Sequence, residues 1–146
     1  MAVLDLNLMA EGIASTLRAA LDTARINVYA HPEGIREAPY ILVRPADPFV
    51  RYQRTFGAAG IAEVRFELLL NAGVPSGAGD SYRLMYEMCG QGAGTTLSVF
   101  DALGADPTLG GMVQTSSALD VGRPVLAEDT GELIALFPIT LQHKRG

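Results

Sequence analysis

The chain has 146 residues, of which 49% are hydrophobic and 18% are charged, and this composition predicts a folded domain rather than a disordered segment. Sixteen acidic residues against eleven basic ones give a net charge of −5, which argues against sequence-independent binding to DNA or RNA, because that binding needs clustered Lys and Arg. One cysteine and two histidines exclude an internal disulfide and the usual zinc sites built from Cys and His.

Two features of the sequence bear on membranes and secretion. No apolar run is as long as the roughly 18 to 20 residues that a membrane-spanning helix needs. The first residues include Asp5 and Glu11, where a secretion signal would carry positive charge. We therefore expect a soluble protein that is made inside the cell and does not bind a membrane.

The first half of the chain is predicted to contain one helix and two strands. Apolar or small residues recur at steps of three and four over residues 6–24, which indicates an amphipathic helix. Strand-favouring residues predict a short strand over 25–30 and a second over 40–43, which should end near Arg44 because prolines flank it. Residues at about 46–61 lack a clean period and are predicted to form a long loop or a hairpin.

In the second half, the clearest element is a strand over residues 62–71, where apolar and charged side chains alternate. A helix should follow, capped by Asp80 or Ser81. Its apolar residues are Leu84, Met85, Met88 and Cys89. A shorter helix should then begin at a cap formed by Thr95 or Thr96 and end at Gly104. Its inward side chains are predicted to be Leu97, Phe100 and Leu103.

Two further strands complete the prediction, over residues 113–119 and 133–142, with a turn region between them. The resulting order α-β-β-β-α-α-β-β lacks the β-α-β alternation of a parallel sheet. We expect one small α+β domain over residues 1–146, in which a mostly antiparallel sheet packs against an N-terminal helix and a central helix pair. The strands over 25–30 or 133–142 are candidate edges that could extend the sheet into another subunit.

Residues 90–95, Gly-Gln-Gly-Ala-Gly-Thr, have the glycine content of a phosphate-binding loop. The run lacks the lysine of a P-loop, and a dinucleotide-binding loop would follow a strand, whereas this one follows a predicted helix. We interpret it as a hinge between two helices and expect no bound nucleotide or other cofactor.

Cys89 would need a nearby histidine to act as a nucleophile, and His31 is the candidate away from the C-terminus. Its place on the apolar face of a helix favours a buried, unreactive side chain instead. The G-x-S-x-G signature of a serine hydrolase is missing, so we expect no catalytic residues and no metal ligands. A small enzyme that uses Cys89 or the glycine run stays open as the alternative from another class.

The segment Asp-Pro-Phe-Val-Arg-Tyr-Gln-Arg-Thr-Phe-Gly at residues 47–57 is the candidate contact surface. Arginine and aromatic residues are enriched at the centres of protein interfaces. The candidate interface residues are Arg51, Tyr52, Arg54 and Phe56. The alternative is that the phenylalanines cover the core while the arginines meet water.

Three segments of the chain together resemble the tail terminator (tail completion) proteins of long-tailed bacteriophages: residues 26–50, 62–73 and 99–121. The most characteristic piece is Ala-Leu-x-Ala-Asp-x-Thr-Leu-Gly-Gly at residues 102–111, where a helix, a turn and the start of a strand follow one another. A strand close to the end of the chain, at 131–141, completes the pattern. These are patterns of small and apolar residues rather than a catalytic signature.

The resemblance implies a small α+β subunit that assembles into a ring, in related phages a hexamer, at the head-proximal end of the tail tube. There it stops tube polymerisation and joins the head connector, so its partners would be copies of itself, the tail tube protein and the connector or stopper protein. DNA would pass through the ring without specific binding, which agrees with an acidic chain. The resemblance places the protein in the virion, at the head-tail junction, after assembly in the host cytoplasm. A head-side connector or stopper protein is the nearest alternative.

Overall fold

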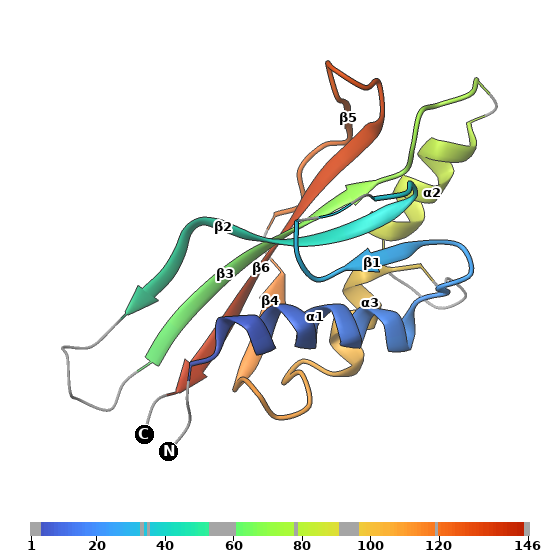
Figure 1. Cartoon of the computed structure of the whole chain (residues 1–146). Helices are drawn as coiled ribbons and strands as arrows, with labels where there is room; N and C mark the ends of the chain where they lie inside the picture. The colour runs from blue at the N-terminus through green and yellow to red at the C-terminus, as the bar shows by residue number, and fades with distance from the viewer. Residues whose placement is uncertain are drawn as a thin grey trace.

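The computed structural model describes residues 4–32, 34, 36–52, 61–77, 79–90, 97–118 and 120–144, with the side chains of residues 61 and 144 excepted. In chain order its elements are α1 (Leu6–Ala20), β1 (Asn27–Tyr29), β2 (Tyr40–Tyr52), β3 (Ile61–Asn71), α2 (Asp80–Cys89), α3 (Val99–Ala105), β4 (Thr115–Ala118), β5 (Val125–Leu126) and β6 (Leu133–Lys144) (Figure 1). The strands form one sheet in the order β1-β2-β3-β6-β4, with β5 also paired to β6.

The expected α+β class with a mostly antiparallel sheet is confirmed. Only the pair β1–β2 is parallel among the strand pairs of the described residues, and the pairs β2–β3, β3–β6, β4–β6 and β5–β6 are antiparallel. In Figure 1 the long strands β2, β3 and β6 cross the molecule, and α1, α2 and α3 lie to one side of them. The far ends of β2 and β3 extend beyond the helices (Figure 1).

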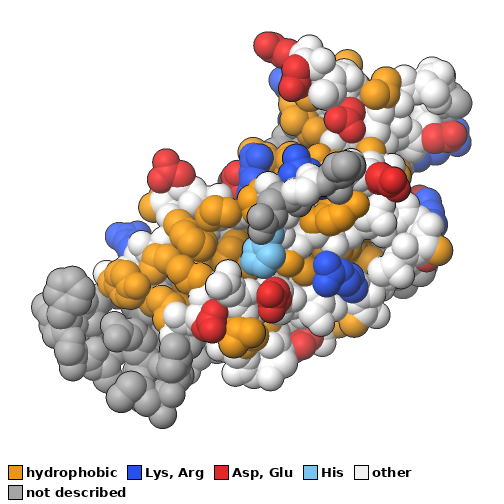
Figure 2. All heavy atoms as spheres, viewed as in Figure 1, with side chains coloured by type: hydrophobic (Ala, Val, Ile, Leu, Met, Phe, Trp, Pro, Cys, Tyr) orange, Lys and Arg blue, Asp and Glu red, His pale blue; other side chains and the backbone are white. Residues whose placement is uncertain are grey.

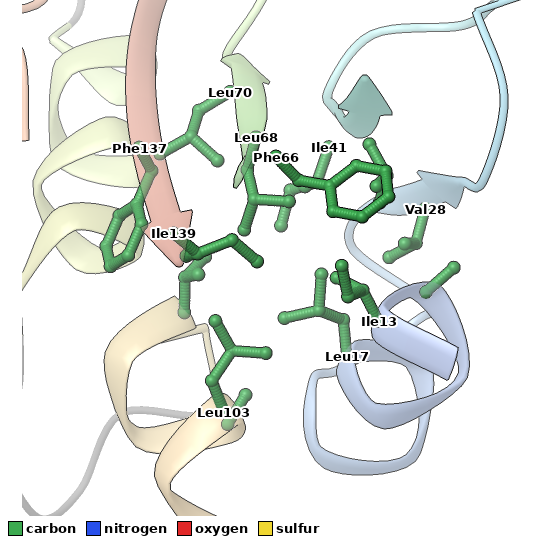
Figure 3. Packing of buried hydrophobic residues seen from close by; sticks show 14 of the residues in the cluster. Ile13, Leu17, Val28, Ile41, Phe66, Leu68, Leu70, Leu103, Phe137 and Ile139 are labelled. Atoms are coloured by element: carbon green, nitrogen blue, oxygen red, sulfur yellow. The ribbon is translucent and has the colours of Figure 1, made fainter. Parts of the chain in front are cut away.

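One face of the sheet forms the core with the helices. Alternate residues of the two central strands are buried on this face, as the two-residue period of a strand requires. They are Ala62, Val64, Phe66, Leu68 and Leu70 on β3, and Leu133, Ala135, Phe137, Ile139 and Leu141 on β6. Figure 3 shows Ile13 and Leu17 of α1 and Leu103 of α3 pointing toward this face. The inward side chains predicted for 62–71 are therefore confirmed.

The helix starts differ in part from the predicted caps. The Asp5 carboxylate accepts a hydrogen bond from the Leu8 amide at 3.0 Å and caps α1. Ser98, not Thr95 or Thr96, caps α3, since its Oγ accepts from the Asp101 amide at 3.1 Å. Gly79 in the left-handed region (φ 81°) precedes α2 without a side-chain cap, so the prediction of a cap at Asp80 or Ser81 was wrong.

The N-terminal helix is shorter than the pattern over 6–24 predicted. Its regular hydrogen bonds end at Ala20, with Leu21 as the C-cap. Asp22 then forms a turn, because its side chain accepts from the Ala24 amide at 3.1 Å and its carbonyl accepts from the Arg25 amide at 3.0 Å. The turn delays the first strand, which covers only Asn27–Tyr29 of the expected 25–30.

The predicted end of the second strand near Arg44 was wrong, because β2 continues through Pro45 and Pro48 to Tyr52. Its pairing with β3 is interrupted between Pro45 and Val50 and then resumes. Of the region at about 46–61, predicted as a long loop or a hairpin, residues 46–52 belong to β2 and Ile61 begins β3, and residues 53–60 lie outside the described part.

Two predictions about the last strands also need correction. The segment 133–142 is not an edge, since β6 has β3 on one side and β4 and β5 on the other. The strand predicted over 113–119 begins only at Thr115 and is described to Ala118, since residue 119 lies outside the described part. The expected turn region contains the short strand β5. Edges depend on contacts between distant segments, so the local pattern did not contain this information.

Candidate functional site

The predicted interface residues lie at the end of the β2–β3 hairpin, as far as the structure describes them. Arg51 and Tyr52 are the last two residues of β2, and both are exposed, Tyr52 at 56%. Arg54 and Phe56 lie outside the described residues. In Figure 2, which has the view of Figure 1, hydrophobic side chains gather on the left half of the visible face, where the outer ends of β2 and β3 lie. Arg51 and Tyr52 are therefore available to a partner, as an interface role requires.

Two aromatic side chains pack together between the outer half of β2 and β3. The rings of Phe49 and Phe66 meet edge to face, with centroids 5.1 Å apart and planes inclined by 80°. Phe66 is buried and Phe49 half-buried against the core. Edge-to-face pairs contribute about 0.5–1.5 kcal/mol beyond their buried area, so this contact holds the strand in place after the irregularity that follows Pro45.

Charged residues alternate on the other face of the hairpin. Arg44 Nε lies 2.6 Å from Glu67 Oε1, and the two residues are directly opposite each other on β2 and β3. Arg51 is likewise opposite Glu63. Cross-strand pairs that are still partly open to water, as Arg44–Glu67 is, typically contribute below about 1 kcal/mol, but they favour this register over a shifted one. Arg51 is thus exposed to a partner and also lies opposite an acidic residue of the neighbouring strand.

A second exposed group, which sequence reasoning missed, lies on α2. Tyr82 and Tyr86 are 38% and 62% exposed, and their ring centroids are 6.1 Å apart. The spacing of four residues places both on one side of the helix, while Met85 and Met88 face the core. The available signal was a pair of tyrosines at positions i and i+4, outside the stripe formed by the methionines.

The described part of the chain also contains a pocket of about 360 Å³ between α3 and the strands β4 and β6. Its lining consists of Phe100, Leu103, Gly104, Ser116, Ser117, Ala118, Phe137 and Ile139. Phe100 was predicted to face inward but is 47% exposed, so that prediction was wrong. The short helix buries Val99, Ala102 and Leu103 at steps of three and four, and Phe100 falls beside this stripe, at the pocket.

Cys89 is half-buried at the end of α2, and this burial raises the pKa of its thiol. An activated cysteine nucleophile needs the opposite shift, toward the thiolate. His31, the histidine considered as its partner, has its Nε2 3.8 Å from Glu11 Oε1 on α1. The structure thus gives Cys89 the environment of a packing residue.

The glycine run follows a helix, as expected, since α2 ends at Cys89 directly before Gly90. Residues 91–96 lie outside the described part. Ser98 Oγ donates a 2.6 Å hydrogen bond to the Gly90 carbonyl, which ties the end of α2 to the start of α3. The two helices flanking the run are therefore held together directly.

Two buried polar atoms, Thr140 Oγ1 and His143 Nδ1, have no hydrogen-bond partner within the described ranges. Their positions on β6 differ by three, so their side chains leave the strand on opposite faces and do not form one site. Among the described residues, no group of three or more His, Cys, Asp or Glu side chains is arranged to hold a metal ion. Within the same ranges, no helix has the length and apolar character needed to cross a membrane.

Comparison with known proteins adds no family assignment. No protein-family model matches the chain, and no curated protein matches it.

Proposed function

We propose that the chain is a structural protein of a long-tailed bacteriophage, the terminator that caps the head-proximal end of the tail tube. In this role copies of the chain form a ring, end the polymerisation of the tube and offer a surface to the head connector. This role requires no catalytic residue, metal or cofactor, and the partners that it requires are proteins.

The observation that supports this proposal most is the structure of residues 102–111, the segment with the characteristic resemblance. It contains the end of α3 and a turn that leads to β4, in the expected order of helix, turn and strand. Leu109, Gly110 and Gly111 have φ values of 51°, 72° and 91°, so the motif's Leu-Gly-Gly occupies three consecutive left-handed positions. Glycine adopts this backbone at little cost, which gives the pattern a physical reason.

Contacts around the turn explain its other residues. The Val113 and Gly111 amides both donate to the Thr108 carbonyl at 3.1 Å, and Leu109 is buried. Gly12 of α1 faces the turn, because a β-carbon built there would lie 3.3 Å from Met112 Cε. The turn therefore connects α3 to β4 and packs against α1, which fixes these three elements relative to one another. A subunit that assembles with a fixed shape needs such contacts.

The arrangement of exposed residues also supports a role in assembly. Arg51 and Tyr52 at the hairpin end and Tyr82 and Tyr86 on α2 belong to separate elements. A ring subunit needs separate surfaces for its neighbours and its other partners, because a cyclic ring is built from heterologous contacts. The net charge of −5 would let DNA pass without strong adhesion.

Deletion of the gene from the phage that encodes it tests the proposal. Without a terminator the tube has no stop, so we expect filled heads together with unattached tails longer than those of the parent phage, measured by electron microscopy. Expression of the chain from a plasmid should restore both tail length and attachment. Unattached tails of normal length would contradict the terminator role and favour the stopper role on the head side.

A further inference from the structure

Among the described residues, the sheet has on each of its two sides a strand without a further neighbour. β1 pairs with β2 only at Tyr40–Leu42, so residues 44–52 of β2 form the border beyond it within the described part of the sheet. Pro45 and Pro48 lie in this stretch, and proline within a sheet is largely confined to edges because it has no N–H to donate. At the other border, β4 is the last strand.

The third candidate edge, β1, is closed by α1. Arg18 Nη2 donates a 2.7 Å hydrogen bond to the Val28 carbonyl. In a parallel strand the N–H and C=O of one residue point to the same side, and the side alternates from residue to residue. The Asn27 amide donates to the Pro39 carbonyl on the β2 side. The backbone groups of Val28 therefore point to the outer side of β1. The guanidinium therefore occupies the outer acceptor of β1, and the edge predicted over 25–30 is not free to extend the sheet.

The β4 edge, in contrast, adjoins the pocket. Ser116, Ser117 and Ala118 of β4 belong to the pocket lining, together with Phe100 and Leu103 of α3. Among the described residues that line the pocket none is charged, so the pocket suits an apolar or aromatic group. Ser116 is opposite the buried Leu141 of β6 and shares its face, so its hydroxyl is available to a polar tip. A strand edge beside such a pocket is the combination that recognises an added strand with one anchoring side chain.

The directions of the strands allow a second copy of the chain to supply that strand. β2, β3, β6 and β4 alternate in direction, so β2 and β4 run opposite to each other. If copies of the chain stand side by side, the β2 border of one copy can meet the β4 edge of the next as an antiparallel pair, and the alternation continues without a break. This contact joins two different surfaces, as ring closure requires.

We propose that β4 of one copy pairs with the outer part of β2 in the next copy, and that Tyr52 of that strand fills the pocket between α3 and β4. Val50, Arg51 and Tyr52 are the residues of β2 that resume regular pairing with β3, so they form a straight border of about the length of β4. Tyr52 is the large exposed apolar side chain of this border. A buried tyrosine needs a partner for its hydroxyl, which Ser116 on the pocket side of β4 provides. This inference rests on the proposed function for the ring itself.

Cross-linking through introduced cysteines tests the contact. Cys89→Ser first removes the native thiol, and the pair Arg51→Cys with Ser117→Cys is then treated with a short bismaleimide on concentrated purified protein. We expect a ladder of covalent oligomers on a denaturing gel for this pair. The matched control replaces Arg51→Cys by Ala24→Cys, an exposed position before the closed β1 edge, and should give no ladder.

A second variant separates the pocket contact from general surface effects. Tyr52→Ala should weaken self-association by about tenfold or more in sedimentation experiments, as for an aromatic residue at the centre of an interface. Val74→Ala shortens another exposed hydrophobic side chain, one outside the candidate contact surfaces, and should leave association unchanged. Equal effects of the two variants would overturn the assignment of Tyr52.

The possible outcomes also distinguish this inference from the proposed function. Oligomers without a ladder for the 51–117 pair, or a protein that stays monomeric at every concentration, would overturn the proposed contact. Overlong tails after gene deletion combined with that result would keep the terminator role and reject this interface. A ladder together with normal tails after deletion would keep the interface and reject the terminator role.

Discussion

Cys89 provides the clearest prediction for a single residue, because it is the only cysteine of the chain and burial raises the pKa of its thiol. A raised pKa means fewer thiolates at neutral pH, so we expect Cys89 to react with iodoacetamide at pH 8 more slowly than the same residue in the urea-unfolded chain. The rate should increase as the pH approaches the raised pKa. Mass spectrometry of the alkylated protein measures this.

The same shift has a consequence for stability. The folded state holds the thiol proton more tightly than the unfolded state, so the contribution of Cys89 is complete below the ordinary thiol pKa and is lost as the pH rises through the raised value. Rapid alkylation of the folded chain at pH 7 would contradict this environment and would revive Cys89 as a reactive group.

At the scale of elements, two glycines at the end of α3 and after it should respond oppositely to alanine. Gly104 lies inside α3 with no atom near a built β-carbon, so Gly104→Ala should stabilise the fold by about 0.5–1 kcal/mol. Gly111 also has space, but its φ of 91° disfavours any side chain, so Gly111→Ala should cost about 1–2 kcal/mol. Urea unfolding compares the two, and a stabilising Gly111→Ala would contradict the left-handed turn.

The elements that the sequence predicted well are those whose period is set by burial on one face. The alternation over 62–71 corresponds to β3 almost to the residue, because a strand with one buried face must alternate. In the first helix, the steps of three and four residues correctly predicted Ala10, Ile13 and Leu17 as buried. Its end was misplaced because the Asp22 turn, rather than the apolar pattern, stops α1.

The errors about the second strand and about the 133–142 edge arose where distant contacts override local rules. Prolines normally end a strand in the middle of a sheet, but Pro45 and Pro48 lie at the border, where no neighbour needs their missing N–H. The candidate contact residues Arg51 and Tyr52 could be predicted from residue type alone, and both are exposed. The pocket beside β4 could not be predicted, because it depends on α3, β4 and β6 meeting in space.

For the whole molecule, the central feature is the asymmetry of one sheet. One border is closed by Arg18 beside β1 and otherwise consists of the outer part of β2, while the opposite border is β4 with its pocket. Unlike borders favour contacts that repeat from copy to copy around a ring rather than a two-fold dimer. The proposed terminator role requires such a ring on the end of a tube.

Electron microscopy of tail tubes tests this role most directly. Tubes assembled without the chain are mixed with the purified protein carrying a gold-labelled terminal tag, and their lengths are followed over time. We predict a ring with label at one end of each tube, the end that later receives the head, and no further elongation. Tubes that continue to lengthen, or label spread along their sides, would contradict the account.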